Sequence, residues 1–188
     1  LQYDDSVVVL DIKQENFQLT SGWRAEQGQE VFLFNPFAED WRTHRWNPLS
    51  YVSRDPAFRV SDLQTIAAML YPDTVDDQKC WVSQARNAFL AFSLYLFDNH
   101  DQEIALGVEE KDATFPTLGR IYRTSSVDGR DLKEQFKEMM DLPFISPECR
   151  TAFAGLLSQA NETFASIMGT FKEPLNAWIN PVLDAATS

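Results

Sequence analysis

One strand–helix–strand pattern opens the chain, and nothing after it supplies another strand. Residues 6–36 read SVVVLDIKQENFQLTSGWRAEQGQEVFLFNP. The apolar run at 7–10 is typical of a strand buried on both faces, and a helix at 15–27 and a second strand at 31–34 are expected after it. Two parallel strands joined by a helix form one crossover unit, which requires further strands beside it. We therefore expect a slice of a larger α/β sheet domain.

Beyond about Arg54 the sequence follows helical periodicity almost throughout. Residues 36–60, which are rich in proline and aromatic residues, are the expected boundary. The predicted fold class is mainly α: a helical bundle inserted into an α/β domain of which this chain holds only a β-α-β slice. Helices are expected at 61–71 (with Ser61 as N-cap), 76–99, 117–124, 130–140, 146–171 and 174–179.

Composition supports a packed core and argues against nucleic acid as a partner. Hydrophobic residues make up 44% of the chain, which excludes wholesale disorder. The net charge of −12 repels phosphate, so direct DNA binding is not expected and basic partners are favoured. Acidity that only maintains solubility is an equally good interpretation. No apolar run reaches the roughly 20 residues that span a bilayer, and no signal peptide is recognised, so we expect a membrane anchor to lie outside this chain.

No motif for a cofactor or a metal is present. The chain has only 7 glycines and no glycine-rich phosphate loop, so it is not expected to be an enzyme by itself. Cys80 and Cys149 lie in different predicted helices without a CxxC pair, which argues against a zinc site. His44 and His100 are single histidines, interpreted as surface or core residues.

Asp11, Lys13 and Glu15 form the one cluster placed where chemistry could occur. They follow the first predicted strand, and open parallel sheets place their ligand crevices at that end of a strand. Carboxylates there can orient a water or a metal near a nucleotide. The alternative interpretation is an acid that caps the following helix, together with a solvated lysine.

An acidic stretch follows the long central helix, and Lys111 is its only basic residue. It is interpreted either as a solvated connector or as a docking patch for basic partners. Its acidic residues are Asp98, Asp101, Glu103, Glu109, Glu110 and Asp112.

Several blocks of the sequence, in order, resemble the TraG/TraD-like conjugative coupling proteins of type IV secretion systems. The blocks are VVVLDIKQENFQLTSGWRAEQGQEVFLFNPF, RWNPLSYV, CWVSQARNAFLAFSLYLFDN, FPTLGRIYR and ETFASIMGTFKEPLNAWINPVLDAATS. In one respect the chain departs from the family: Gln14 stands where the DxKGE motif has glycine, which removes a permissive backbone position and puts a finely tuned role of Glu15 in doubt.

The resemblance implies a RecA-like ATPase that forms homohexameric rings at the cytoplasmic face of the bacterial inner membrane and uses ATP and Mg²⁺. It implies an all-α domain at 54–173, flanked by parts of the nucleotide-binding domain at 1–53 and 174–188. The all-α domain would bind effector proteins or a relaxase and deliver them to other components of the secretion channel. Taken out of its ring, this chain is expected to be monomeric. The alternatives are a contribution of Asp11 or Glu15 to ATP hydrolysis, contact with DNA, or an insertion that only sets ring geometry.

Overall fold

The computed structural model describes residues 5–73, 79–126 and 131–188, and over these ranges the secondary structure is helical without a β-strand. The mainly α class is therefore confirmed. The helices are α1 (Glu15–Glu26), η1 (Pro48–Tyr51), α2 (Pro56–Leu70), α3 (Lys79–Ala105), α4 (Leu118–Thr124), α5 (Leu132–Met140), α6 (Pro147–Leu157), α7 (Asn161–Leu175), η2 (Asn176–Ile179) and α8 (Pro181–Ala186).

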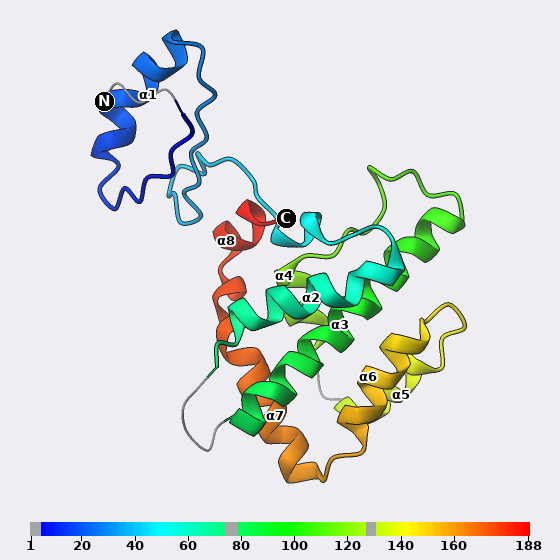
Figure 1. Ribbon diagram of the computed structural model, residues 1–188. Coiled ribbons are helices and arrows are strands. Elements are labelled where there is room, and N and C mark those ends of the chain that lie inside the picture. Colours follow the sequence, from blue (N-terminus) through cyan, green and yellow to red (C-terminus); the bar gives the residue numbers. More distant parts are fainter. Residues whose placement is uncertain (1–4, 74–78, 127–130) are drawn as a thin grey trace.

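A helical body formed by α2 to α7 surrounds the long helix α3, which packs against α2, α4, α6 and α7 (Figure 1). Its centre is aromatic. The ring of Phe92 on α3 lies 5.1 Å from that of Phe136, 5.5 Å from Phe153 and 5.3 Å from Phe171, and all four side chains are fully buried. One side chain of α3 thereby joins α5, α6 and α7 into a single core.

Local capping residues set most helix starts. Thr117, Asp131 and Ser146 each accept a backbone hydrogen bond at the first turn of α4, α5 and α6. The prediction for α2 was wrong: Asp55 caps this helix and Pro56 occupies its first position, so Ser61 lies inside it. An aspartate followed by proline is a stronger start signal than the serine, because proline at the first position needs no amide partner.

Three helix ends also differ from the predictions. α3 continues to Ala105, so the first part of the expected acidic connector is helical. The helix expected at 146–171 is two helices, with a turn at 158–160, and both α6 and α7 pack on α3. The apolar stripe runs through this turn, and Ala160 offers no side-chain cap that would reveal it. Of the helix expected at 174–179, residues 174–175 belong to α7 and residues 176–179 form η2, and a further helix, α8, begins at Pro181. The helix starts expected at 76 and 130 lie outside the described residues.

The N-terminal region, residues 5–46, corrects the predicted β-α-β unit. Its helix is present as α1, but 7–10 and 31–34 form no strands. A strand is held by its ladder, and here no sheet lies alongside. The amides of Leu33 and Asn35 instead donate to His44 Nδ1 (3.0 Å) and Thr43 Oγ1 (2.8 Å). Side chains thus satisfy backbone groups that a neighbouring strand would otherwise pair.

The N-terminal region projects from the end of the helical body where α8 lies (Figure 1). The Trp46 amide donates to the Ala186 carbonyl (2.9 Å), and Asn47 Nδ2 donates to the Pro116 carbonyl (2.8 Å). α8 itself lies against α4, where a Cβ added to Gly119 would overlap the Asp184 carboxylate. Parts of the chain that are far apart in sequence therefore meet at one joint.

Candidate functional site

The Asp11, Lys13 and Glu15 cluster lies at the start of α1. Asp11 Oδ2 accepts the backbone N–H of Phe17 at 2.8 Å, so this carboxylate caps the first turn of the helix. The Lys13 and Glu15 side chains are exposed, and over the described ranges neither forms an ion pair. Capping accounts for Asp11; a role of these residues in ATP hydrolysis stays a prediction.

Gln14 adopts a left-handed backbone conformation, with φ 59° and ψ 12°. This is a region that glycine occupies without steric cost, whereas other residues adopt it at a cost of roughly 1–2 kcal/mol. The turn before α1 therefore requires the backbone freedom that the DxKGE pattern supplies and that this chain lacks.

Part of the acidic stretch at 98–112 lies in the interior of the helical body and not on its surface. Asp98 is 7% exposed, and its Oδ2 accepts from the amide (2.8 Å) and hydroxyl (2.7 Å) of Ser146. The guanidinium of Arg59, itself 2% exposed, lies 2.8 Å from Asp101 Oδ2 and 3.8 Å from Asp98 Oδ1. Burial raises the pKa of Asp98, and the Ser146 hydrogen bonds and the Arg59 charge partly offset this. Asp98 therefore joins α2, α3 and α6 and is not available on a docking patch.

Arg54 lies beside Arg59, and its backbone carbonyl accepts a hydrogen bond from Arg59 Nη2 at 3.2 Å. Its Nη2 donates to Glu110 Oε1 at 3.0 Å, its Nη1 lies 3.2 Å from His100 Nε2, and its guanidinium carbon lies 4.8 Å from the centre of the Phe115 ring. His100 is buried, as one of the two interpretations of this residue required. Glu110 thus forms an ion pair within the chain.

The other acidic residues lie on the segment that returns from α3. Glu103 accepts the amide of Thr114 and so fixes the base of this loop. Glu109 lies 2.7 Å from Lys111, with both side chains exposed. Asp112 is exposed and has no ion pair among the residues that the structure describes. Most of the predicted patch is therefore engaged within the chain.

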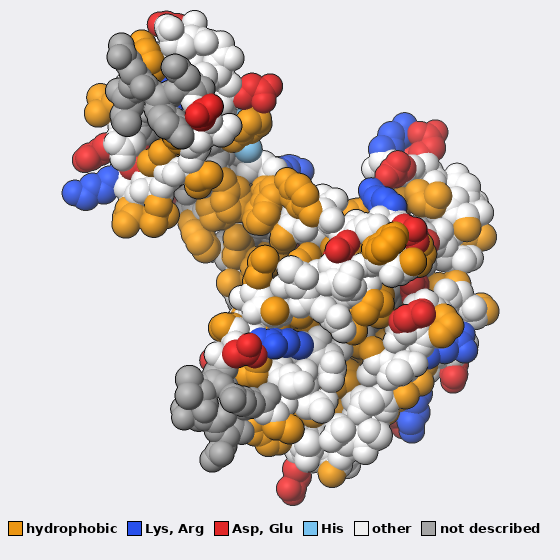
Figure 2. All heavy atoms as spheres, viewed as in Figure 1, with side chains coloured by type: hydrophobic (Ala, Val, Ile, Leu, Met, Phe, Trp, Pro, Cys, Tyr) orange, Lys and Arg blue, Asp and Glu red, His pale blue; other side chains and the backbone are white. Residues whose placement is uncertain are grey.

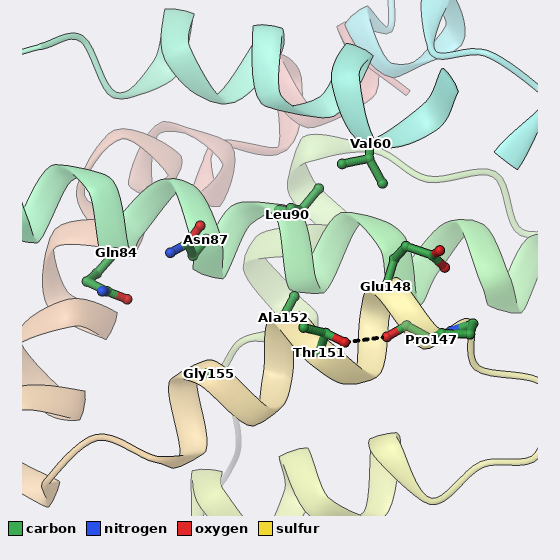
Figure 3. Close-up of a pocket in the computed structure, with 9 residues that line it drawn as sticks. All are labelled: Val60, Gln84, Asn87, Leu90, Pro147, Glu148, Thr151, Ala152 and Gly155. Carbon is green, nitrogen blue, oxygen red and sulfur yellow. Dashed lines mark hydrogen bonds between the residues drawn. The ribbon is translucent and has the colours of Figure 1, made fainter. Parts of the chain in front are cut away.

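Two grooves on the helical body were not foreseen. The first, which we call the α3–α6 groove, has a volume of about 460 Å³ and is lined by Val60, Gln84, Asn87, Leu90, Pro147, Glu148, Thr151, Ala152 and Gly155. Figure 3 shows α2, α3 and α6 each contributing to it, with Leu90 between Val60 and Ala152. Gln84 and Asn87 place carboxamides in the lining of this groove. Among the described residues, Glu148 is the only charged residue that lines this groove.

The second, the α5–α7 groove, also has a volume of about 460 Å³. Its lining residues are Asp131, Leu132, Lys133, Asn161, Phe164, Ala165, Met168, Gly169 and Lys172. Lys133 Nζ donates to the Gln159 carbonyl at 2.6 Å and lies 5.2 Å from the centre of the Phe164 ring. Burial lowers the pKa of Lys172. This groove therefore combines an apolar floor with two lysines.

A glycine lines each groove, inside a helix and without a packing reason. A Cβ added to Gly155 of α6 or to Gly169 of α7 would meet no atom within 4 Å. Glycine inside a helix costs roughly 0.5–1 kcal/mol relative to alanine. Gly155 and Gly169 interrupt the apolar periodic pattern of 146–171, and this interruption is the sequence feature from which the two grooves could have been predicted.

Within the described ranges, no group of His, Cys, Asp and Glu side chains could hold a metal ion. No helix there is long and apolar enough to cross a membrane. Cys149 is a buried core residue whose Sγ lies 3.6 Å from the Ala91 carbonyl, and burial raises its pKa.

Comparison with known sequences decides the family. The profile of the type IV secretory system conjugative DNA transfer family matches residues 1–188. The chain belongs to this family. The predicted membership among type IV secretion coupling proteins is confirmed.

Curated relatives in the conjugative DNA transfer family cover the whole chain at low identity. Protein VirD4 of Rhizobium radiobacter is 27% identical over 192 residues, which span 100% of this chain and 25% of the relative. Protein VirD4 of Agrobacterium fabrum is 28% identical, over 100% of this chain and 26% of its own length. The conjugal transfer protein TraG of Escherichia coli is 24% identical, over 97% of this chain and 28% of its own length. The chain spans about a quarter of these relatives.

Proposed function

We propose that the helical body is the cargo-binding part of a type IV secretion coupling protein, with residues 1–53 and 174–188 belonging to its RecA-like domain. The whole protein would be a homohexameric ATPase that uses ATP and Mg²⁺ at the cytoplasmic face of the inner membrane. Its cargo would be effector proteins or a relaxase complex, and the family's description, conjugative DNA transfer, is consistent with the second.

One observation carries this proposal: the helical body closes its own core, whereas the N-terminal region does not. α1 has no buried residue, and large apolar side chains around it lie open to solvent. These side chains are Val8, Val9, Leu10, Ile12, Leu19, Phe32 and Phe37. Figure 2 shows hydrophobic side chains gathered on this region and where it meets the helical body. Exposed apolar surface of this extent is typical of a region that another surface covers, and we infer that the remaining sheet of an ATPase domain covers it.

The test is a titration of the isotope-labelled chain with the candidate cargo, either the relaxase or an effector's signal domain from the same genome. We expect backbone resonances of the helical body to shift and those of α1 to stay in place. A Cβ at either Gly155 or Gly169 would meet no atom within 4 Å, so Gly155→Phe and Gly169→Phe each place a ring in one groove and identify the groove that is used. Flat titrations with both cargo classes at high micromolar concentration would remove the proposal.

A second candidate function is a contribution to ATP hydrolysis. It is favoured by the exposure of Lys13 and Glu15 at the start of α1. The measurement is the ATPase rate of the whole coupling protein carrying Glu15→Ala, with Glu26→Ala at the other end of α1 as the control. An undiminished rate for Glu15→Ala would exclude Glu15 from catalysis.

A further inference from the structure

The α5–α7 groove has a floor that is apolar and already ordered. The Phe164 and Met168 side chains are 6% and 4% exposed and come from one face of α7. Gly169 beside them leaves open space, because a Cβ added there would meet no atom within 4 Å. An apolar side chain of a partner could therefore lie on this floor without rearranging the chain.

Among the described residues, two lysines and one aspartate line this groove, in a chain of net charge −12. Within the described residues, neither Lys133 nor Lys172 forms an ion pair with a carboxylate. In the part of the lining that the structure describes, the acid is Asp131, and its Oδ1 accepts the Lys133 backbone amide at 2.8 Å. Partial burial of Lys172 weakens its hydration, so an anionic partner would offset a desolvation that is already present.

The α3–α6 groove provides a comparison within the same molecule. Both grooves have a volume of about 460 Å³ and an open helix glycine. Over the described ranges they differ in charge, since Glu148 is the only charged residue in one lining while two lysines and Asp131 line the other. Charge complementarity therefore assigns different partners to two grooves of equal size.

We propose that the α5–α7 groove binds an acidic amphipathic peptide segment of a protein partner. An apolar side chain of that segment would pack on Phe164 and Met168, and a neighbouring carboxylate would face Lys133 and Lys172. This inference rests on the proposed function, because it names the chemistry of one cargo segment that the helical body recognises.

The probe is a short fluorescein-labelled peptide that contains adjoining leucine and glutamate residues, and binding to the whole chain is followed by fluorescence polarisation. We expect Lys172→Gln to weaken binding about fivefold, as for a partly exposed ion pair of about 1 kcal/mol. Gly169→Leu should abolish binding by filling the floor. The matched controls, Lys137→Gln on the exposed side of α5 and Gly155→Leu in the other groove, should leave affinity unchanged.

Replacing the peptide's glutamates by glutamine should weaken binding at least as much as Lys172→Gln does, because the carboxylates also face Lys133, and added salt should reduce the difference between the two peptides. Equal affinity for the acidic and amide peptides would overturn the assignment. So would a loss of affinity in Gly155→Leu as large as the loss in Gly169→Leu. Lys133 is left intact because its contacts with Gln159 and Phe164 also support the fold. Thermal unfolding of each variant verifies folding. Cargo that shifts the helical body but competes with no acidic peptide would refute this groove and leave the proposed function standing.

Discussion

The helical body and the N-terminal region contain the same kinds of side chain in opposite environments. Phe92 is fully buried among three other phenylalanine rings, whereas Phe32 is 71% exposed and Leu10 is 90% exposed. α3 is surrounded by four helices, while α1 has no buried residue. The difference shows that apolar side chains alone do not make a core, because each must pack against a second apolar surface to be buried. The helical body holds its own second surface, whereas among the described residues the N-terminal region has none.

The sharpest test of this contrast is a pair of phenylalanine truncations. Phe92→Ala should lower the free energy of unfolding by about 4 kcal/mol, because it opens a cavity among the rings of α5, α6 and α7. Phe32→Ala should change it by less than about 0.5 kcal/mol. Urea unfolding followed by circular dichroism measures both. Similar losses at the two positions would show that the N-terminal region has a core of its own.

Removing the cation beside a buried carboxylate should lower the free energy of unfolding nearly as much as removing a buried ring. Arg59→Met leaves the buried Asp98 carboxylate without its nearby cation, which we expect to cost about 3 kcal/mol. Arg54→Met removes the exposed pair with Glu110 and should cost at most about 1 kcal/mol. Chemical denaturation of the two variants side by side measures the difference. A harmless Arg59→Met would mean that Asp98 is neutral in the folded chain.

The joint between the two regions is sensitive at Gly119. Gly119→Ala places a methyl group against the Asp184 carboxylate and should destabilise the docking of α8 by about 2 kcal/mol. Gly155→Ala meets no neighbour and should stabilise the chain by about 0.5–1 kcal/mol. Amide hydrogen exchange in α8 and thermal unfolding follow the two effects. A Gly119→Ala variant as stable as wild type, with unchanged exchange in α8, would mean that α8 is not held against Gly119.

Restoring glycine at position 14 should affect the N-terminal region alone. Gln14→Gly relieves the left-handed backbone before α1 and should slow amide exchange in this helix by an amount equivalent to about 1 kcal/mol. Gln18→Gly, inside α1, should accelerate exchange by a similar amount. Urea unfolding of the helical body should be the same in both variants. A change there would indicate that α1 and the body unfold together.

The smallest expected effect is a pH dependence from Asp98. Burial raises its folded pKa above the usual value of about 3.9, so between these two values the folded chain binds more protons than the unfolded chain. Stability from this group is therefore lost as pH rises through the folded pKa and regained as pH falls. We expect wild type to gain stability relative to Asp98→Asn when pH is lowered from 7 toward 4. A constant difference across this range would contradict the raised pKa.

The N-terminal region also explains where prediction from sequence succeeded and failed. The helix at 15–26 was predictable because its capping acid and apolar spacing are local. The strands at 7–10 and 31–34 were not, because strand formation depends on a neighbour that periodicity does not report. His44 looked like an isolated histidine, yet its ring accepts a backbone amide that the expected ladder would have used.

In the helical body, the acidic residues of 98–112 and the two grooves show the same limit of prediction from sequence. Charge counting identified Asp98 and Asp101 as surface candidates, but their partner Arg59 is 42 positions away from Asp101 and lies on a different helix. Nothing in the local sequence indicated that pairing. Lys133 and Lys172 likewise meet in one groove only because α5 and α7 fold against each other.

The amino-acid sequence by itself determined the helical class, the family and most helix starts, since periodicity, motifs and caps act within a few residues. Tertiary structure alone decided which charges are buried, which glycines are open and where the two grooves lie. These features depend on side chains brought together from distant parts of the chain. Their energies arise from desolvation and packing, which exist only once those surfaces have met.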